Sequence, residues 1–426
     1  MPLGEYATTG AGKDSASASY AGVTLADMRN YVPFSRGRLI ELPFMGGKLY
    51  EQLERITVPG GEAWVDVIKE FAEVGDKPET FAMKVYPNTQ IGTKKYFFAY
   101  STQKEIYSTL CGVGGNPNVL QFGSCYYDPT LHVDGAEGSG AVVYVLEFVD
   151  SRMHAGHVTF QRGYHFDEAL EATCSIARLL STTDLFNIAH RDIKPQNILM
   201  PADVVSGNVK KIYPKRAKLF DYDMAWFPAV AVAEGFDVSD FAGAIVGTPG
   251  YMSPEAIRGK EEAFLPLVDR YSLGMTALTF LTNNNNPWGL KPEATPMQRI
   301  FYASNVFSKQ GMPSGVEKLA EIDNKRLRDG TREMIEGLLA VDGMKRWEAD
   351  RVVVRCDELL EYSKRIRREE LLFDDISPDD VSEYSAQTLA DSALDVEGIN
   401  AKMQAEGDLP RTMFIDRDEA RTIPIY

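Results

Sequence analysis

The first half of the chain carries its apolar residues in short runs. Between positions 50 and 149 these runs are ITV, WVDVI, TFAMKVY and VVYVLEFV, and one helix-like stretch covers 100–110. Runs of this length that are rich in β-branched and aromatic residues are typical of strands. The pattern therefore predicts a small β-rich unit with a single helix.

After position 149 the apolar residues recur at helical spacing over longer stretches, 166–185, 269–281 and 332–339. This spacing predicts amphipathic helices. A β-rich unit followed by a helical one is an α+β, two-lobed arrangement. We expect a small lobe over 41–149 and a large lobe over 150–370.

The two ends of the chain lack such periodicity. Residues 1–40 are mostly small and polar, and 371–426 are acidic and poor in aromatic residues. Segments of this composition bury too little apolar surface to offset the entropy of ordering. We expect a flexible N-terminal tail and a solvated, acidic C-terminal tail instead of a third domain.

Charge and cysteine content narrow the functional class. The formal net charge is −16, which argues against a nucleic-acid binder that works by bulk electrostatics. The four cysteines lie far apart without the spacing of metal ligands, as expected of core thiols in a reducing compartment. No signal peptide is seen, and the longest apolar run, 141–149, is about half of the roughly 18 residues of a membrane span. We expect a cytoplasmic protein, or one of another reducing intracellular compartment, without a membrane span.

The most specific motif is HRDIKPQNIL at 190–199, and it resembles the catalytic loop of the protein kinase family. The resemblance implies that Asp192 takes the proton of the substrate hydroxyl and that Asn197 binds a metal ion. Lys194 matches the cation that the serine/threonine members carry there, where it steadies the transferring phosphoryl group. Phosphoryl transfer needs mainly positioning and charge neutralisation, which this spacing of carboxylate and amide supplies.

A second motif, LFDYDMA at 219–225, resembles the family's DFG segment. Asp221 matches the aspartate that binds magnesium, and Tyr222 keeps the aromatic ring. Asp223 replaces the glycine, which restricts the backbone. Its carboxylate either draws in a second divalent cation or repels the phosphates.

The segment GTPGYMSPE at 247–255 resembles the end of a kinase activation loop. The resemblance implies that Thr248 approaches Asp192 and Lys194. It also implies that Glu255 forms a structural ion pair with Arg346 and that Asp269 holds the backbone of the catalytic loop.

The nucleotide side of the resemblance is carried by TFAMKVY, where Lys84 matches the lysine that contacts the α- and β-phosphates. Glu105 is the candidate for its helix partner. The segment VPGGEAWV at 58–65 meets the family's glycine-rich loop only in part, because valine and alanine occupy the outer glycine positions. The residues that the resemblance places around ATP are Gly60, Gly61, Val65, Ala82, Lys84, Glu147, Val149 and Leu199.

The resemblance as a whole implies an ATP-dependent protein kinase. It would transfer the γ-phosphate to Ser or Thr of a protein substrate and use Mg²⁺ or Mn²⁺. Asp223 and the depleted glycine loop leave a pseudokinase open as the alternative, a folded scaffold or nucleotide-binding protein. A kinase of small molecules is disfavoured by Lys194 and by the 247–255 segment, which resemble features of peptide acceptors.

The hydroxyl and acidic residues of the activation loop indicate whether activity needs phosphorylation of this loop. Between Met224 and Val246 the single Ser or Thr is Ser239, and it is surrounded by Glu234, Asp237 and Asp240. Arg191 of the HRD motif ordinarily seeks an anion. We expect a loop carboxylate to supply that anion, so that activity does not need phosphorylation of the loop.

Overall fold

The structure is a computed structural model of the 426-residue chain. It describes residues 36, 39–42, 48–57, 64–70, 78–88, 94–112, 116–128, 140–149, 154–205, 208–241, 245–289, 294–309 and 311–374. Most of the predicted N-terminal tail and the acidic tail after Asp374 lie outside these residues. The chain divides into two units, Met1–Ser363 and Lys364–Tyr426.

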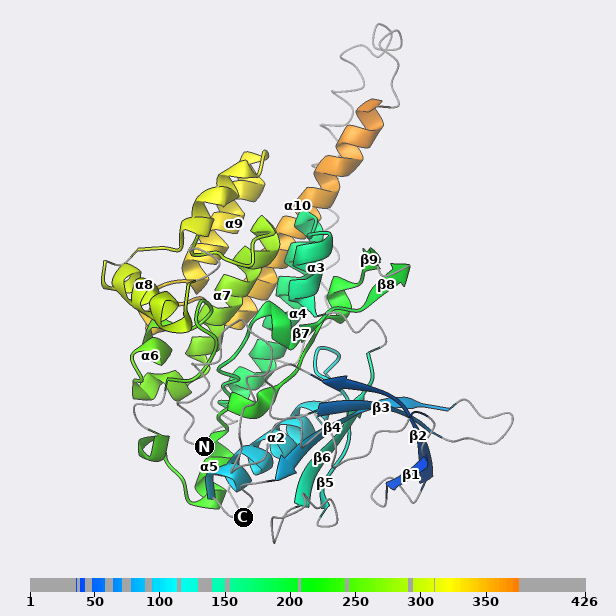
Figure 1. Cartoon of the computed structure of the whole chain (residues 1–426). Helices are drawn as coiled ribbons and strands as arrows, with labels where there is room; N and C mark the ends of the chain where they lie inside the picture. Colours follow the sequence, from blue (N-terminus) through cyan, green and yellow to red (C-terminus); the bar gives the residue numbers. More distant parts are fainter. Residues whose placement is uncertain are drawn as a thin grey trace, which may run out of the picture. The chain divides into compact units, whose positions relative to one another are not determined.

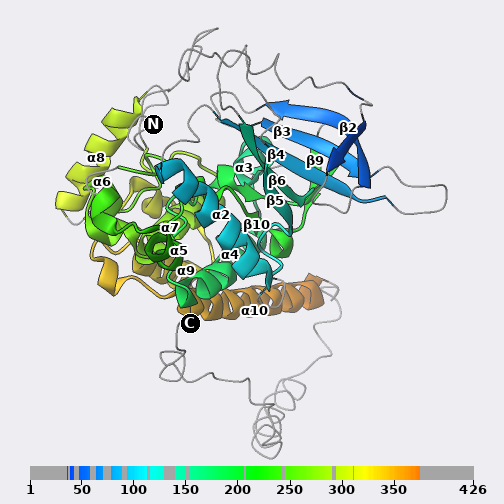
Figure 2. The same cartoon turned by 90° about the horizontal axis from the view of Figure 1, so that it is seen from below.

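The small lobe is a six-stranded antiparallel sheet with the order β1-β2-β3-β4-β6-β5. Its strands are β1 (Leu39–Leu42), β2 (Lys48–Thr57), β3 (Trp64–Glu70), β4 (Thr80–Asn88), β5 (Phe122–Asp128) and β6 (Gly140–Glu147). The helix α2 (Lys94–Gly112) lies beside the sheet in both views (Figures 1 and 2). The predicted β-rich lobe with one helix is confirmed.

The core of the small lobe forms where strand and helix meet. Val143 and Val145 of β6 are almost fully buried, as are Ile106 and Leu110 of α2. The Tyr144 hydroxyl donates to the backbone oxygen of Tyr100 over 3.1 Å, which joins β6 to α2. Because consecutive residues of β6 are buried, both faces of this strand are covered.

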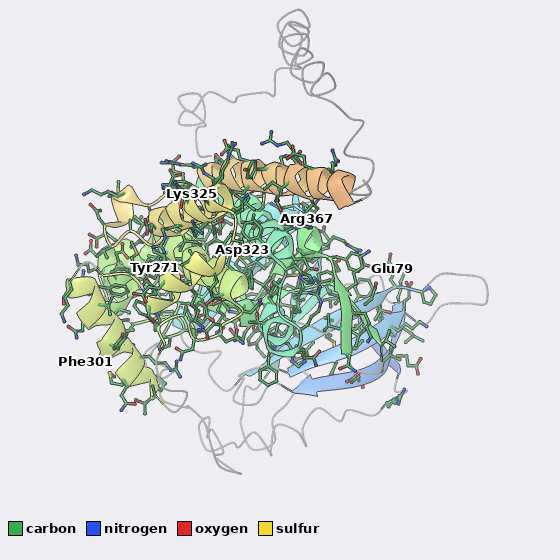
Figure 3. The ribbon with its side chains drawn as sticks, turned by 90° about the horizontal axis from the view of Figure 1, so that it is seen from above. Glu79, Tyr271, Phe301, Asp323, Lys325 and Arg367 are labelled. Carbon is green, nitrogen blue, oxygen red and sulfur yellow. The ribbon has the colours of Figure 1, made fainter. Side chains whose placement is uncertain are left out.

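The large lobe is mainly helical, as expected. Its longer helices within the first unit are α4 (Phe166–Leu185), α7 (Leu267–Thr282), α8 (Pro296–Ser308) and α9 (Lys325–Leu338), and α10 (Ala349–Asp374) runs from the first unit into the second. Helix α7 is buried along most of its length. At Gly274 an added Cβ would lie 2.8 Å from the Leu338 Cβ, so glycine allows α7 and α9 to approach closely. In Figure 3, Tyr271 of α7 lies among the helices and Phe301 on the outer side of α8.

Short strands and turns carry the chain between the helices α4 and α7. Strand β7 (Ile198–Leu199) pairs with β10 (Lys218–Leu219), and β8 (Ala202–Val205) pairs with β9 (Asn208–Ile212). The Leu219 amide donates to the backbone oxygen of Asn118 over 2.8 Å, which ties this region to the small lobe. None of the described helices combines the length and the apolar character of a membrane span.

The predicted ion pair between Glu255 and Arg346 is confirmed. The Arg346 Nη2 lies 2.8 Å from Glu255 Oε1, and the arginine side chain is fully buried. The guanidinium also donates to the backbone oxygens of Ala340 and Leu267. These bonds satisfy the guanidinium inside the lobe, so the pair fixes the end of the activation segment to the helical core.

Replacement of Arg346 should therefore destabilise the large lobe strongly. We expect Arg346→Ala to lower the free energy of unfolding by about 3–5 kcal/mol, because Glu255 is left buried without a partner. The side chain of the neighbouring Lys345 is 79% exposed, and its Nζ lies 3.7 Å from Asp342 Oδ2. Lys345→Ala should therefore change the free energy of unfolding by about 0.5 kcal/mol or less. Urea unfolding compares the two variants, and equal losses would show that the buried pair has no special weight.

Candidate active site

The catalytic loop is held in place by a buried carboxylate at the start of α7. Asp269 accepts the backbone amide of His190 over 2.6 Å and that of Arg191 over 2.8 Å. Arg191 has a φ of 68°, an unfavourable backbone conformation for a residue with a side chain. The two hydrogen bonds offset that cost, and the expected role of Asp269 is confirmed.

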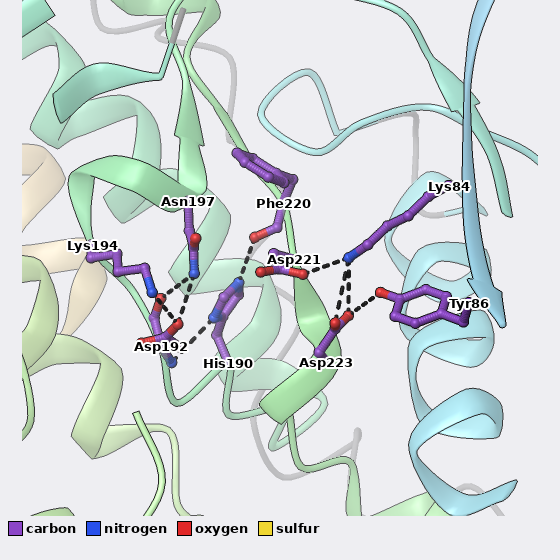
Figure 4. Close-up of polar contacts among 9 residues, drawn as sticks. All are labelled: Lys84, Tyr86, His190, Asp192, Lys194, Asn197, Phe220, Asp221 and Asp223. Carbon is purple, nitrogen blue, oxygen red and sulfur yellow. Dashed lines mark hydrogen bonds and ion pairs between the residues drawn. The ribbon is translucent and has the colours of Figure 1, made fainter. Parts of the chain in front are cut away.

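Three polar side chains converge on Asp192, and Figure 4 shows two of them, Lys194 and Asn197. Lys194 Nζ lies 2.7 Å from Asp192 Oδ2, and Asn197 Nδ2 donates to the same oxygen over 3.0 Å. The Thr248 hydroxyl donates to Asp192 Oδ1 over 2.7 Å and accepts from Lys194 over 2.6 Å. The predicted approach of Thr248 to both residues is confirmed, and it closes the activation segment onto the catalytic loop.

Gly247, directly before Thr248, makes this closure sterically feasible. It has a φ of 116°, and an added Cβ would lie 2.7 Å from the backbone oxygen of Arg191. A side chain at this position would meet both a strained backbone and a clash with the catalytic loop.

The His190 ring connects the catalytic loop to the residues before Asp221. Its Nδ1 accepts the Asp192 amide over 3.3 Å, and its Nε2 lies 3.0 Å from the backbone oxygen of Phe220. These partners require a proton on Nε2, so the ring is neutral. Burial lowers the pKa of His190, which agrees with that assignment.

Asp221 follows β10 and begins the tight turn η5 (Tyr222–Met224). Asp221 itself adopts the left-handed conformation, with a φ of 71°. The φ of Asp223 is not positive. The side chain that replaces the family's glycine at this position therefore causes no backbone strain in this conformation. The Tyr222 ring is buried between Tyr107, at 5.2 Å between centroids, and His190, at 4.6 Å.

Lys84 of β4 reaches this turn from the small lobe (Figure 4). Its Nζ lies 2.6 Å from Asp221 Oδ1 and 3.2 Å from Asp223 Oδ1. The Tyr86 hydroxyl donates to Asp223 Oδ1 over 2.5 Å. The carboxylate of Asp223, which is expected to draw in a cation or to repel phosphates, contacts a lysine and a tyrosine.

The charges of this cluster shift one another. Burial opposes the positive charge of Lys84, but the carboxylates of Asp221 and Asp223 outweigh it and raise the pKa of the lysine. Burial and the charge of Asp221 raise the pKa of Asp223 to about 7. Burial also opposes ionisation of Asp221, yet Lys84 holds its pKa down at about 2. The turn therefore holds one firmly ionised carboxylate next to a firmly charged lysine.

The expected pair between Lys84 and Glu105 is not formed. Glu105 is exposed to solvent on α2, and Gln103 and Tyr107 face inward instead. The Gln103 side chain is hydrogen-bonded to the Tyr86 hydroxyl. Residues two apart on a helix point to different sides. The buried positions 103, 106, 107 and 110 recur at helical spacing, and this spacing is the signal in the sequence that identifies the inner face of α2.

Two of the other residues expected around ATP, Val65 and Ala82, lie on the strands of the sheet that carries Lys84. Val65 is opposite Lys84 in the β3–β4 register, and Ala82 is opposite Leu146 in the β4–β6 register. Strand β6 ends at Glu147, whose carboxylate lies 2.9 Å from Lys218, and Val149 follows outside the strand. Leu199 lies on β7. Gly60 and Gly61 lie outside the described residues.

The expected carboxylate partner of Arg191 is replaced by an aromatic ring. The Arg191 guanidinium lies 4.1 Å from the centroid of Phe264. Glu234, at the end of α5 (Pro228–Glu234), accepts instead from Ser101 over 3.1 Å. Asp237 accepts the amide and the hydroxyl of Ser239. The guanidinium is buried by stacking, so this part of the expectation is corrected.

The donor atoms at the site suit a hard divalent cation held jointly with a nucleotide. Within the described part of the chain, no group of three or more His, Cys, Asp and Glu side chains could hold a metal by itself. Asn197 uses its Nδ2 to bind Asp192, which leaves its amide oxygen for a ligand. An amide oxygen and a carboxylate such as Asp221 match magnesium, which takes its remaining ligands from phosphate and water.

The lobes and the site define a protein kinase, and the sequence comparisons agree. Residues 71–355, more than half of the chain, match the protein kinase domain. The chain belongs to the protein kinase family.

Three relatives illustrate the similarity. Protein kinase C zeta type from Oryctolagus cuniculus is 26% identical over 46% of this chain and 28% of its own length. Atypical protein kinase C from Drosophila melanogaster is 24% identical over 54% and 32%. Serine/threonine-protein kinase AtPK2/AtPK19 from Arabidopsis thaliana is 27% identical over 54% and 41%. The matches thus cover less than half the length of each relative.

The Tyr222 ring gives a stability test of this site. Its hydroxyl is buried and has no hydrogen-bond partner among the described residues. We expect Tyr222→Phe to raise the free energy of unfolding by about 1 kcal/mol, because it removes an unpaired polar group. The matched control is Tyr144→Phe, which removes the bond to Tyr100 and should destabilise. A loss of stability in Tyr222→Phe would indicate an unseen partner of its hydroxyl.

Proposed function

We propose that the chain is an ATP-dependent protein kinase that transfers the γ-phosphate to Ser or Thr of a protein substrate. The observation that carries this proposal is the joint arrangement of Asp192, Lys194 and Thr248, with Thr248 bonded to both other residues. A carboxylate and a cation held next to the end of the activation segment suit a hydroxyl acceptor.

The roles follow from the contacts. Asp192 accepts the proton of the acceptor hydroxyl, and the Asn197 amide donates to Asp192, which fixes the direction of its carboxylate. Lys194 neutralises charge next to the same carboxylate. Electrostatic groups that are already in position stabilise the transition state without reorganisation.

The nucleotide side is proposed from the neighbouring cluster. Lys84 would bind the α- and β-phosphates, and Asn197 with Asp221 would hold Mg²⁺ or Mn²⁺. A metal held there would supply positive charge to neutralise the charge that develops on the phosphates. Val65, Ala82 and Leu199 would surround the adenine, and backbone groups of Glu147 and Val149 would hydrogen-bond it. Gly60 and Gly61 would cover the phosphates.

The preference for Ser and Thr has two supports. Lys194 occupies the position where serine/threonine kinases carry a lysine, and it contacts Asp192 and Thr248. The Arabidopsis relative is a serine/threonine-protein kinase by name. Both point to the same acceptor class.

Loss of the carboxylate or of the lysine should abolish transfer. We expect Asp192→Asn to lower the rate by roughly 10²–10⁴-fold, the usual contribution of a positioned base, and Lys84→Met to lower it by a comparable factor. Glu105→Gln is the control on the neighbouring helix and should keep the wild-type rate, because Glu105 is exposed. Labelled ATP, magnesium and a basic acceptor protein provide the assay.

Two outcomes would contradict the proposal in different ways. Near wild-type turnover in both variants would show that the active site lies elsewhere. Turnover of the wild type at the level of Asp192→Asn, with nucleotide still bound, would favour the pseudokinase that Asp223 and the depleted glycine loop leave open.

Activity should not depend on phosphorylation of the activation loop. The buried Arg191 guanidinium already stacks on Phe264, and Ser239 is bonded to Asp237. We expect Ser239→Ala, and wild type after phosphatase treatment, to keep the untreated wild-type rate within about twofold, since no transition-state contact is removed. A collapse of the rate under either condition would mean that a phosphate organises the loop.

A further inference from the structure

The position of Lys84 in this protein is set by the metal-binding turn. In protein kinases the corresponding lysine is held by a glutamate of the helix beside the sheet. Here the inner face of α2 presents Gln103 to this region, and Glu105 points to solvent. Both carboxylates at Lys84, Asp221 and Asp223, come from the turn after β10.

Asp223 is built into a fixed arrangement. Its carboxylate receives hydrogen bonds from Lys84 and from Tyr86, two residues on the same face of β4. The Lys84 Nζ also lies 4.8 Å from the centroid of the Tyr86 ring. Tyr86 in turn packs edge-on against Tyr144, at 5.7 Å between centroids, and is bonded to Gln103. Figure 4 shows Asp223 and Tyr86 on one side of the lysine head and Asp221 on the other.

We infer that Asp223 is the positioning residue for Lys84 and supplies the carboxylate contact that a helix glutamate supplies in other kinases. This inference rests on the proposed function of Lys84 as a phosphate-binding residue. Asp221 is a proposed metal ligand and therefore has a second task, whereas Asp223 is not among the proposed ligands. A carboxylate that serves the lysine alone keeps it aligned while Asp221 faces the metal.

The arrangement has a consequence for regulation. Asp223 lies two residues after Asp221 on the turn η5, so the lysine and the metal ligand are aligned by one rigid element. In a kinase with a lysine–glutamate pair, a displacement of the helix breaks the pair directly. Here the carboxylates that contact Lys84 lie on η5, and α2 contacts this turn through the rings of Tyr107 and Tyr222. A movement of α2 would therefore reach Lys84 through the turn.

The test moves the charge from the turn to the helix. Asp223→Asn removes the charge and keeps the size, and we expect kcat to fall by roughly 10²-fold, as misplacement of a reacting group does, with a smaller rise in the KM for ATP. Gln103→Glu should restore most of kcat in the Asp223→Asn background, because it places a carboxylate on the inner face of α2. In the wild-type background the same change adds a third carboxylate and should lower kcat. Glu105→Gln is the control and should leave both backgrounds unchanged.

A second readout does not depend on turnover. Lys84→Met, Asp223→Asn and the double variant are unfolded by heat without nucleotide. The Tm shifts of the single variants should sum to more than the shift of the double variant, because the residues interact directly. Additive shifts would overturn the inference.

The outcomes separate the inference from the proposed function. Wild-type kcat and KM in Asp223→Asn, together with an inactive Asp192→Asn, would overturn the role of Asp223 and leave the kinase function intact. Failure of Gln103→Glu to restore an impaired Asp223→Asn would also overturn it. If wild type and Asp192→Asn are equally inactive, the proposed function fails, and the unfolding experiment still decides whether Asp223 holds Lys84.

Discussion

The carboxylate of Asp269 is the constraint on which the catalytic loop depends. It is 1% exposed and accepts two consecutive backbone amides, those of His190 and Arg191. Buried amides without partners are costly, and Arg191 adopts a left-handed backbone that side chains disfavour. The carboxylate satisfies the amides and compensates for the strain, so the next residues emerge in a fixed direction. Asp192 and Lys194 owe their position to this anchor.

A second set of contacts joins the two lobes at the site. Lys84 reaches from β4 to the turn after β10, and the backbone of Leu219 bonds that of Asn118. Lys218 meets Glu147, where the small-lobe sheet ends. These contacts lie on both sides of the region where the nucleotide is proposed to bind. They join Lys84 to the turn that carries Asp221. Among the described residues, no charged side chain of α2 takes part in this connection.

Residues 247–255, at the end of the activation segment, are held by two different kinds of contact. Thr248 is held by hydrogen bonds to the charged groups of the catalytic loop. Glu255 is held by the fully buried Arg346. Arg191 of the catalytic loop is covered by the Phe264 ring, so stacking takes the place of the ionic contact expected from a loop carboxylate. The catalytic loop and Arg346 thus hold this end of the segment.

The sequence by itself determined the elements whose chemistry lies in contiguous motifs. The catalytic loop, the DYD turn and the 247–255 segment each have their residues within one turn or loop, where local geometry decides their spacing, and the Glu255–Arg346 pair followed from the same resemblance. The alternation and the helical spacing of apolar residues similarly predicted a β-rich and a helical lobe. Only the tertiary structure decided the partners of Lys84. Asp223 is 139 residues away in the sequence, and the choice between Gln103 and Glu105 depends on the rotation of α2 about its axis. Such long-range pairings are set by how sheet, helix and turn pack together, because packing decides which polar groups are buried side by side and must satisfy one another.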